Sequence, residues 1–336
     1  WPGWLKTFYD DRWPVRVVGS SSSVAALRKH RLESGVGRWD EHYLSPYLFN
    51  EYLELAGELP ELPGGATLWA SVCAMVEGGV RLPDLEGRRR TFLIGGGFPE
   101  ILFSSAVGQA EQTLMLRSQQ TLGKDAIERT IYKDIPQAVG VQSPKELERL
   151  LYVLAGQAAG ILSPQGVCRS LGNITQPTLE QSYMVFTLAN YASTEESKQR
   201  RGRKVYFVDG AVRNAALQRG LLPLNDPREL GILVENLAAS HLHALGLQTQ
   251  ARVYHWRDGD HEVDLVYDHP SEPMAFEVST SAGHRSAGLR EFQRRFPRYR
   301  GRTFKVMVGG ALRGPDAETL EPGALPLDAF LLATAG

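Results

Sequence analysis

The stretch HEVDLVYDHPSEPMAFEVSTS, residues 261–281, decides the fold of the last third of this chain. Its two alternating runs, HEVDLVYD and MAFEVSTS, flank the turn-forming sequence HPSEP, which predicts two consecutive strands. Just upstream, ARVYHWRD and the turn DGD predict a hairpin with the first of these strands. A helical pattern, GILVENLAASHLHALG, precedes the hairpin, and a helix (GLREFQRRFPRYR) and a strand (FKVMVGG) follow. We therefore expect a mixed sheet with flanking helices.

Three acidic residues from different predicted elements can meet at one end of this sheet. Glu235 lies in the preceding helix, Asp264 on the second strand of the hairpin and Glu277 on the next strand. The two-residue period of a strand also places Glu262 on the same face as Asp264. Carboxylate oxygens suit hard divalent cations, so Asp264 and Glu277 are candidate ligands for Mg²⁺. Two alternatives stay open: Asp264 pairs with Arg257 across the hairpin, and Glu235 caps or bridges helices.

The composition is that of an ordinary multi-domain globular protein. The chain has 336 residues, with 43% hydrophobic and 22% charged residues and 37 basic against 38 acidic side chains, so any basic surface must be local. No apolar run approaches the roughly 18 residues of a membrane span. The two cysteines, Cys73 and Cys168, lie in apolar helical patterns without metal-binding spacing. We expect buried free thiols and a soluble protein of the reducing cytoplasm with no membrane partner.

Residues 1–57 alternate helix, strand and helix in the manner of an α/β core. The strand predicted at residues 15–18 in VRVVGSSS leads into a serine run, in which Ser22 or Ser23 could cap the next helix and Ser20 could be catalytic. The chain opens on Trp1 inside an apparent helix, which indicates a missing N-terminal part. No GxxxxGK[ST] phosphate loop occurs, so this chain is not expected to hydrolyse ATP.

The middle of the chain has helical patterns, and residues 109–190 are expected to contain no strand. ILSPQGVCRSLG and NITQPTLEQSYMVFTLANYA have the stops and starts of a three-helix winged helix-turn-helix. The basic segment TEESKQRRGRK would be its wing, with Arg200, Arg201, Arg203 and Lys204 as DNA contacts. The alternative is a packing module with an exposed loop, because half of the recognition helix is apolar.

The order of G-x-L-x-E-N (residues 231–236), YHWRDGDHEVDLV and AFEV resembles the restriction-endonuclease-like (PD-(D/E)XK) domain found C-terminal to a large prokaryotic family of AAA-type ATPases. VVGSSS is similar to the sensor strand of that family, and GRWDEHYLSPYLFNEYLEL to its "GR…L.P.SF.EY" segment. GGGFPEI resembles its "GGFPE" turn, and residues 145–208 resemble its winged helix. The resemblance extends over nearly the whole chain.

This resemblance implies an α/β protein with four parts. Residues 1–57 would be the C-terminal part of an AAA-type ATPase core, 58–140 a helical lid-like region, 141–204 a winged helix-turn-helix and 205–336 the endonuclease-like domain. Ser20 would lie near the γ-phosphate of ATP, which binds only with the missing N-terminal part. Arg38 would act as an arginine finger in the same or a neighbouring subunit, so a homo-oligomer is compatible with this interpretation.

One departure bears on activity. The family motif E-x-K reads E-V-S here, so Ser279 replaces a lysine that would orient the attacking water and stabilise charge on the phosphate. Arg285 or Arg290 from the next helix could replace that cation. Three functions remain: an ATPase-associated, non-cleaving nuclease-like protein acting on DNA or a protein partner, a metal-dependent DNA nuclease, or a non-enzymatic regulatory module.

The histidines carry less weight. His241 and His243 are two apart on a helix and should point to different faces, so they are not expected to form a metal pair. His261 is expected to be an exposed turn residue, with a role as a ligand as the alternative.

Overall fold

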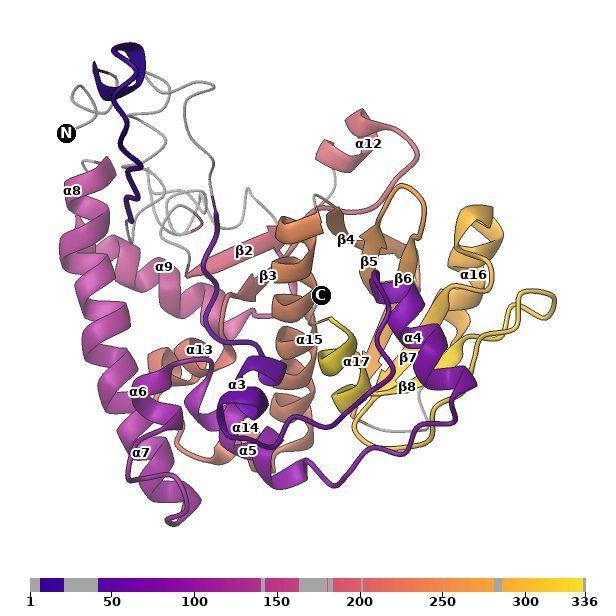
Figure 1. The fold of residues 1–336 in the computed structure, drawn as a ribbon, viewed down its shortest axis with the longest axis horizontal. Coiled ribbons are helices and arrows are strands. Elements are labelled where there is room, and N and C mark those ends of the chain that lie inside the picture. The colour runs from indigo at the N-terminus through magenta and orange to yellow at the C-terminus, as the bar shows by residue number, and fades with distance from the viewer. Residues whose placement is uncertain are drawn as a thin grey trace.

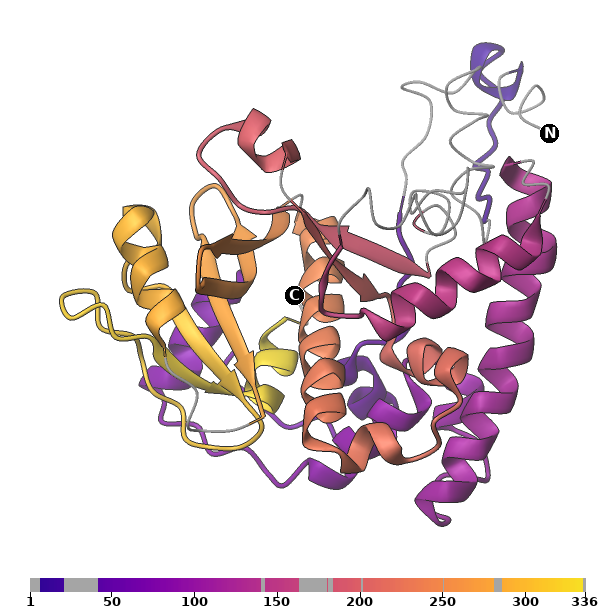
Figure 2. The same ribbon diagram turned by 180° about the vertical axis from the view of Figure 1, so that it is seen from behind.

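Two β-sheets and a long helix between them organise the molecule (Figures 1 and 2). This computed structural model describes residues 7–20, 42–139, 143–162, 180, 184–200, 202–249, 251–280 and 286–334. The mixed α/β architecture expected from the sequence is confirmed at this level. The expected boundaries between four domains stay predictions.

The N-terminal half is mostly helical. Its helices are α3 (Phe49–Leu55), α4 (Leu68–Glu77), α5 (Glu86–Gly95), α6 (Pro99–Leu102) and α7 (Glu111–Thr121). The last of these continues through the π-helical segments η1 (Leu122–Glu128) and η2 (Thr130–Asp134) into α8 (Ile135–Val139), and α9 (Pro144–Gly156) follows. Apolar residues of these helices join one large core with both sheets.

A three-stranded sheet lies in the middle of the chain. It contains β1 (Ile161–Leu162), β2 (Val185–Leu188) and β3 (Arg203–Phe207) in the antiparallel order β1-β3-β2, with α12 (Glu195–Arg200) between β2 and β3. The prediction that residues 109–190 contain no strand is therefore wrong. Both strands that it missed are short apolar runs, whose periodicity cannot be told from that of a helix, and pairing with β3 decides their conformation.

The five-stranded sheet has the order β4-β5-β6-β7-β8. The hairpin of β4 (Arg252–Asp258) and β5 (His261–Asp268) turns at Gly259, whose φ of 57° suits glycine, and β6 (Met274–Ser279) is antiparallel to β5. After α16 (Ala287–Arg295) and η3 (Pro297–Tyr299), β7 (Thr303–Met307) and β8 (Gly323–Pro326) add parallel to β6. The predicted hairpin, third strand, helix and fourth strand are all present.

Helix α15 (Pro227–Thr249) stands between the two sheets and contacts strands of both (Figure 1). The shorter helices α13 (Gly210–Leu217) and α14 (Leu222–Asn225) lead into it from β3. It is long and apolar enough to cross a membrane, but 61% of its apolar window is buried inside the molecule. A helix at the centre of a folded core is buried in this way.

The two sheets are joined where the chain leaves β2. His255 of β4 donates its backbone N–H to Ala189 O (3.1 Å) and accepts from Tyr191 N (2.6 Å). Between these bonds, the Asn190 side chain pairs with the backbone N–H and C=O of Arg257, at 3.0 and 3.1 Å. The buried amide of Asn190 therefore fixes the register between β2 and β4.

The GGFPE turn ties the helical half to the loop after β3. Gly96 has a φ of 65°, and the Gly97 N–H donates to the Asp209 carboxylate at 2.7 Å. A Cβ on Gly97 would lie 2.2 Å from Tyr47 O, so only glycine fits this close approach. These contacts hold the turn close to Asp209 and to the backbone of Tyr47.

The segment around residues 15–18 is not a strand in the structure. Val15 and Val17 are each 52% exposed and Val18 is 88% exposed, and no described strand lies beside them. A strand needs hydrogen-bonding neighbours, so the apolar sequence alone does not produce one. Ser20 is exposed at the end of this segment. Ser22, Ser23 and Arg38 lie outside the described residues.

The last helix, α17 (Leu327–Ala333), packs against the early helices α3 and α4. Its Phe330 ring contacts Phe276 of β6, with centroids 5.0 Å apart. Trp69 of α4 lies 6.3 Å from Phe304 of β7 by ring centroids. One face of the five-stranded sheet is therefore covered by segments from opposite ends of the sequence.

Candidate functional site

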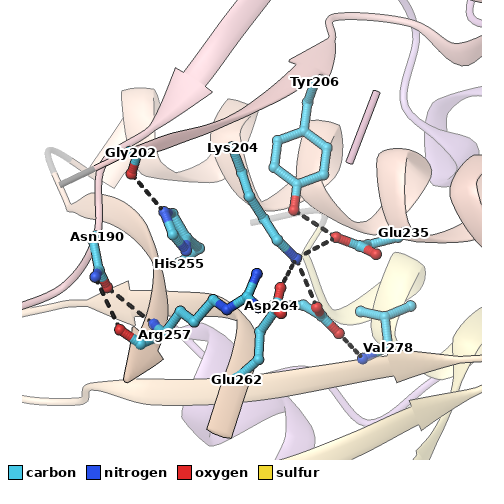
Figure 3. Close-up of polar contacts among 10 residues, drawn as sticks. All are labelled: Asn190, Gly202, Lys204, Tyr206, Glu235, His255, Arg257, Glu262, Asp264 and Val278. Atoms are coloured by element: carbon cyan, nitrogen blue, oxygen red, sulfur yellow. Dashed lines mark hydrogen bonds and ion pairs between the residues drawn. The ribbon is translucent and has the colours of Figure 1, made fainter. Parts of the chain in front are cut away.

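A buried lysine lies at the centre of the acidic residues (Figure 3). The Lys204 ammonium is 3.0 Å from Glu235 Oε1, 2.6 Å from Glu262 Oε1 and 2.9 Å from Asp264 Oδ1, and the side chain is 3% exposed. Tyr206 donates its hydroxyl to the same Glu235 oxygen at 2.7 Å. The structure thus brings Glu235 and Asp264 to one place, around a cation from another sheet.

Local structure explains this convergence. Lys204 and Tyr206 are two residues apart on β3, so both side chains point toward α15, and Glu262 and Asp264 share a face of β5 in the same way. Glu235 is held in place by its neighbour Asn236, whose amide accepts from Phe207 N at 2.8 Å and donates to Phe207 O at 2.9 Å.

The charges in this cluster depend on one another. Burial alone would lower the pKa of Lys204, but Asp264, Tyr206 and the two glutamates together raise it well above its ordinary value. Burial and the nearby Asp264 charge raise the pKa of Glu235 to about 7, although Lys204 acts in the opposite direction. Lys204 is therefore charged at neutral pH, whereas Glu235 gains or loses its proton near neutral pH.

Glu277 lies on the neighbouring strand β6 and is 6% exposed. Its pKa is raised to about 7, first by burial and then by the charge of Asp264, while Lys305 lowers it. Lys305 of β7 is the direct register partner of Glu277. Ser279, in the expected lysine position, ends β6 beside Met307.

The metal prediction meets an obstacle in Asp264. Its Oδ1 accepts from Lys204 and its Oδ2 accepts from the backbone N–H of Val278 at 2.9 Å, so both oxygens are engaged within the protein. Among the described residues, no group of three or more His, Cys, Asp or Glu side chains is arranged to hold a metal ion. The Lys204 ammonium lies where a cation bound to Asp264 Oδ1 would lie, and the prediction that Asp264 and Glu277 bind Mg²⁺ stays a prediction.

The predicted basic wing needs correction at Lys204. Its side chain was expected to be exposed and to contact DNA, but it is buried in ion pairs with the acids of α15 and β5. Lys198 also turns inward, with Nζ 4.8 Å from the ring centroid of Tyr254. Arg203 is half-buried and donates to Thr187 Oγ1 at 3.4 Å. Arg201 and the side chain of Arg200 lie outside the described residues, so their DNA contacts stay predictions.

The remaining residues fall outside this cluster. His241 Nε2 accepts from Phe49 N at 2.9 Å, whereas the His243 ring stacks on Phe186 with centroids 4.1 Å apart, which confirms that the two histidines face different ways. His261 is exposed. Arg290 pairs with Glu321 instead of the acids, while Arg285 lies outside the described residues.

The two cysteines and Arg257 complete the account of the sequence predictions. Cys73 is a free, partly buried thiol, and Cys168 lies outside the described residues. Arg257 is opposite Glu262 in the hairpin register, and Asp264 pairs with Lys204. The alternative pairing of Asp264 with Arg257 is not the one that the structure shows.

Three members of the cluster were not predicted as a unit: Lys204, Tyr206 and Glu262. The signal for the first two was present in KVYFVD, where a lysine and a tyrosine alternate with apolar residues on a strand expected to be buried. A lone charge in such a pattern requires an opposite charge inside the fold.

Two protein families match parts of this chain, and both are described as domains of unknown function. The first (DUF8612) matches residues 87–222, and the second (DUF4143) matches residues 230–313. The second domain is often found in proteins associated with AAA-type ATPases. No curated protein and no solved structure matches the chain.

Proposed function

We propose that residues 205–336 form an endonuclease-like domain that docks a partner without cutting it, within a cytoplasmic AAA-type ATP-binding protein acting on DNA or another protein. ATP binding is tied in this proposal to a phosphate loop that the 336 residues do not contain. Any homo-oligomer would be needed only if Arg38 acts on a neighbouring subunit.

The order of elements supports the endonuclease-like part. Helix α15, the antiparallel strands β4, β5 and β6, helix α16 and the parallel strand β7 follow one another in one unit. Glu235, Asp264 and Glu277 lie on its first helix, second strand and third strand. These are the three positions at which the resemblance expects acids, and the second family match covers all of them.

The three-stranded sheet supports a winged-helix part. Helix α9 and β1 precede residues 163–183, and β2, α12 and β3 follow, with β3 in the middle of the sheet. A hairpin pairing with a short first strand is what a winged helix requires. The inward positions of Lys198 and Lys204 favour its use as a packing module over direct phosphate contact.

The observation that carries the non-cleaving proposal is the state of Asp264. A metal-dependent nuclease needs this carboxylate as a ligand, yet Lys204 and the Val278 amide hold its two oxygens. Ser279 supplies no cation beside it. A bound phosphate would therefore meet acids whose charge Lys204 offsets only in part, without the metal that would neutralise the rest.

The test is a DNA cleavage assay with Mg²⁺ and with Mn²⁺ on three proteins: the wild type, Asp264→Ala and Ser279→Lys. We expect no cutting by the wild type or Asp264→Ala, and a gain, if any, only in Ser279→Lys. Robust wild-type cutting that Asp264→Ala abolishes would overturn the proposal.

One observation favours a metal-dependent nuclease as the second candidate. Lys305 lies opposite Glu277 on the neighbouring strand and on the same face, so an ammonium is present near the place of the missing lysine. In that case Lys305→Ala should abolish wild-type cutting while Arg290→Ala, which removes a cation paired with Glu321, should retain it.

A further inference from the structure

Three carboxylates surround the Lys204 ammonium. It donates to Glu235 at 3.0 Å and to Asp264 at 2.9 Å, and it forms an ion pair with Glu262 at 2.6 Å. The side chain is 3% exposed, against 17% for Glu235 and 14% for Asp264. A buried charge of this kind is stable only with paired acceptors, so the acids and the lysine form one unit.

The distances explain why no metal is needed here. A divalent cation such as Mn²⁺ or Mg²⁺ binds carboxylate oxygens at about 2.0–2.2 Å, and Ca²⁺ binds them at about 2.3–2.6 Å. An ammonium at 2.6 to 3.0 Å from the same oxygens leaves no room for such an ion. It supplies one positive charge to a cluster of three acids, so removing it would leave an acidic cage that attracts cations.

The contacts also cross a boundary in the fold. Lys204 belongs to β3 of the three-stranded sheet, whereas its acceptors come from α15 and from β5 of the five-stranded sheet. The nearby bonds of His255, whose ring lies 3.1 Å from Gly202 O, join the same two sheets. The lysine therefore joins the two sheets at the cluster of Glu235, Glu262 and Asp264.

We infer that Lys204 is a built-in cation that takes the place of a divalent metal, fastening the three-stranded sheet to the acidic face of α15 and β5, and that its removal opens a divalent-cation site. This rests on the proposed function only for the idea that the acids form a nuclease-like site. The oxygens of Glu235, Glu262 and Asp264, which are not arranged to hold a metal ion in the structure, would close around the ion in the space that the Lys204 ammonium leaves.

The experiment measures the thermal unfolding midpoint and Mn²⁺ affinity of the full chain, with free Mn²⁺ followed by its paramagnetic resonance signal. In the wild type we expect a midpoint that Mn²⁺ does not change. Lys204→Ala should have a lower midpoint that Mn²⁺ raises, and it should bind Mn²⁺ more tightly than the wild type by about tenfold or more.

Two controls locate the effect. Lys198→Ala removes another inward lysine that contacts tyrosine rings and Glu195, and it should gain no Mn²⁺ response. The double variant Lys204→Ala with Asp264→Asn should lose the response that Lys204→Ala gained. A response that persists in the double variant would place the ion elsewhere and overturn the inference.

The remaining outcomes are also decisive. If Lys204→Ala fails to fold without metal, recovery of folded protein on adding Mn²⁺ is expected, and no recovery would contradict the inference. Equal Mn²⁺ affinity in the wild type and Lys204→Ala would do the same. DNA cleavage by the wild type, in contrast, would contradict the proposed function. It would not decide the inference about Lys204, which the Mn²⁺ and unfolding measurements test.

Discussion

Glu277 is an acid that the fold holds in an unfavourable place for its charge. It is buried on β6 beside the charge of Asp264, and together these raise its pKa to about 7 from an ordinary value of 4.5. Between these two pH values the folded state keeps a proton that the unfolded chain has released. Stability from this group is therefore complete below about pH 4.5 and is lost as pH rises toward 7.

Glu277→Gln should remove that loss. We compare the decrease in the free energy of unfolding between about pH 5 and about pH 8. This decrease should be smaller in the variant than in the wild type, by roughly 2 kcal/mol. Buried histidines such as His241, with its pKa lowered to about 4, change stability in the opposite direction, so only the difference between the two proteins isolates Glu277. Urea titrations at both pH values measure it.

The matched control is Glu100→Gln at an exposed position in α6. It should show the pH dependence of the wild type. The same slope in Glu277→Gln and in the wild type would show that the proton does not reside on Glu277.

At the scale of elements, the connection between β2 and β3 illustrates how a charged segment can be turned inward. Its sequence is among the most basic in the chain, yet Lys198 lies over aromatic rings and Lys204 in an acidic cluster. The net charge available to a phosphate backbone is smaller than the sequence indicates. Any DNA affinity would depend on the arginines.

This predicts an unequal contribution to the salt dependence of DNA binding. Arg200→Ala and Arg201→Ala should each reduce the slope of log K against log salt by about 0.9, because each contact releases counterions from one phosphate. Lys198→Ala should leave the slope unchanged. Fluorescence anisotropy with a short duplex at several salt concentrations measures this, and a loss of slope in Lys198→Ala would contradict the packed position of its ammonium.

The sequence predicted single elements better than it predicted which elements and side chains contact one another. The hairpin of β4 and β5 could be predicted because alternation and a DGD turn are local signals. The short strands β1 and β2 could not be, since they depend on pairing with β3. Lys204 was assigned to a DNA-binding surface because the sequence does not show that Asp264, 60 residues later, lies opposite it.

On the scale of the whole molecule, Asn236 is the contact that seats α15 on the three-stranded sheet. It is fully buried, and its amide satisfies both backbone groups of Phe207. Because β3 and the acids of α15 meet beside it, this one side chain also aligns Glu235 with Lys204.

Asn236→Ala should lower the free energy of unfolding by about 2–4 kcal/mol, because a buried N–H and a buried C=O lose their partner. Asn225→Ala, at an exposed position in α14, should change it little. Chemical denaturation compares the three proteins. A loss below about 1 kcal/mol in Asn236→Ala would indicate that water or another group can replace the amide.

The packing of α17 on α4 means that α4 is synthesised long before the segment that covers it. The apolar side of α4, with Trp69, is covered by β7 and by α17. Helix α17 (Leu327–Ala333) is synthesised about 250 residues after Glu77. At about 5–20 residues per second, that interval lasts roughly 10–50 seconds. During this time the exposed helix offers a ready binding surface to chaperones that act on nascent chains.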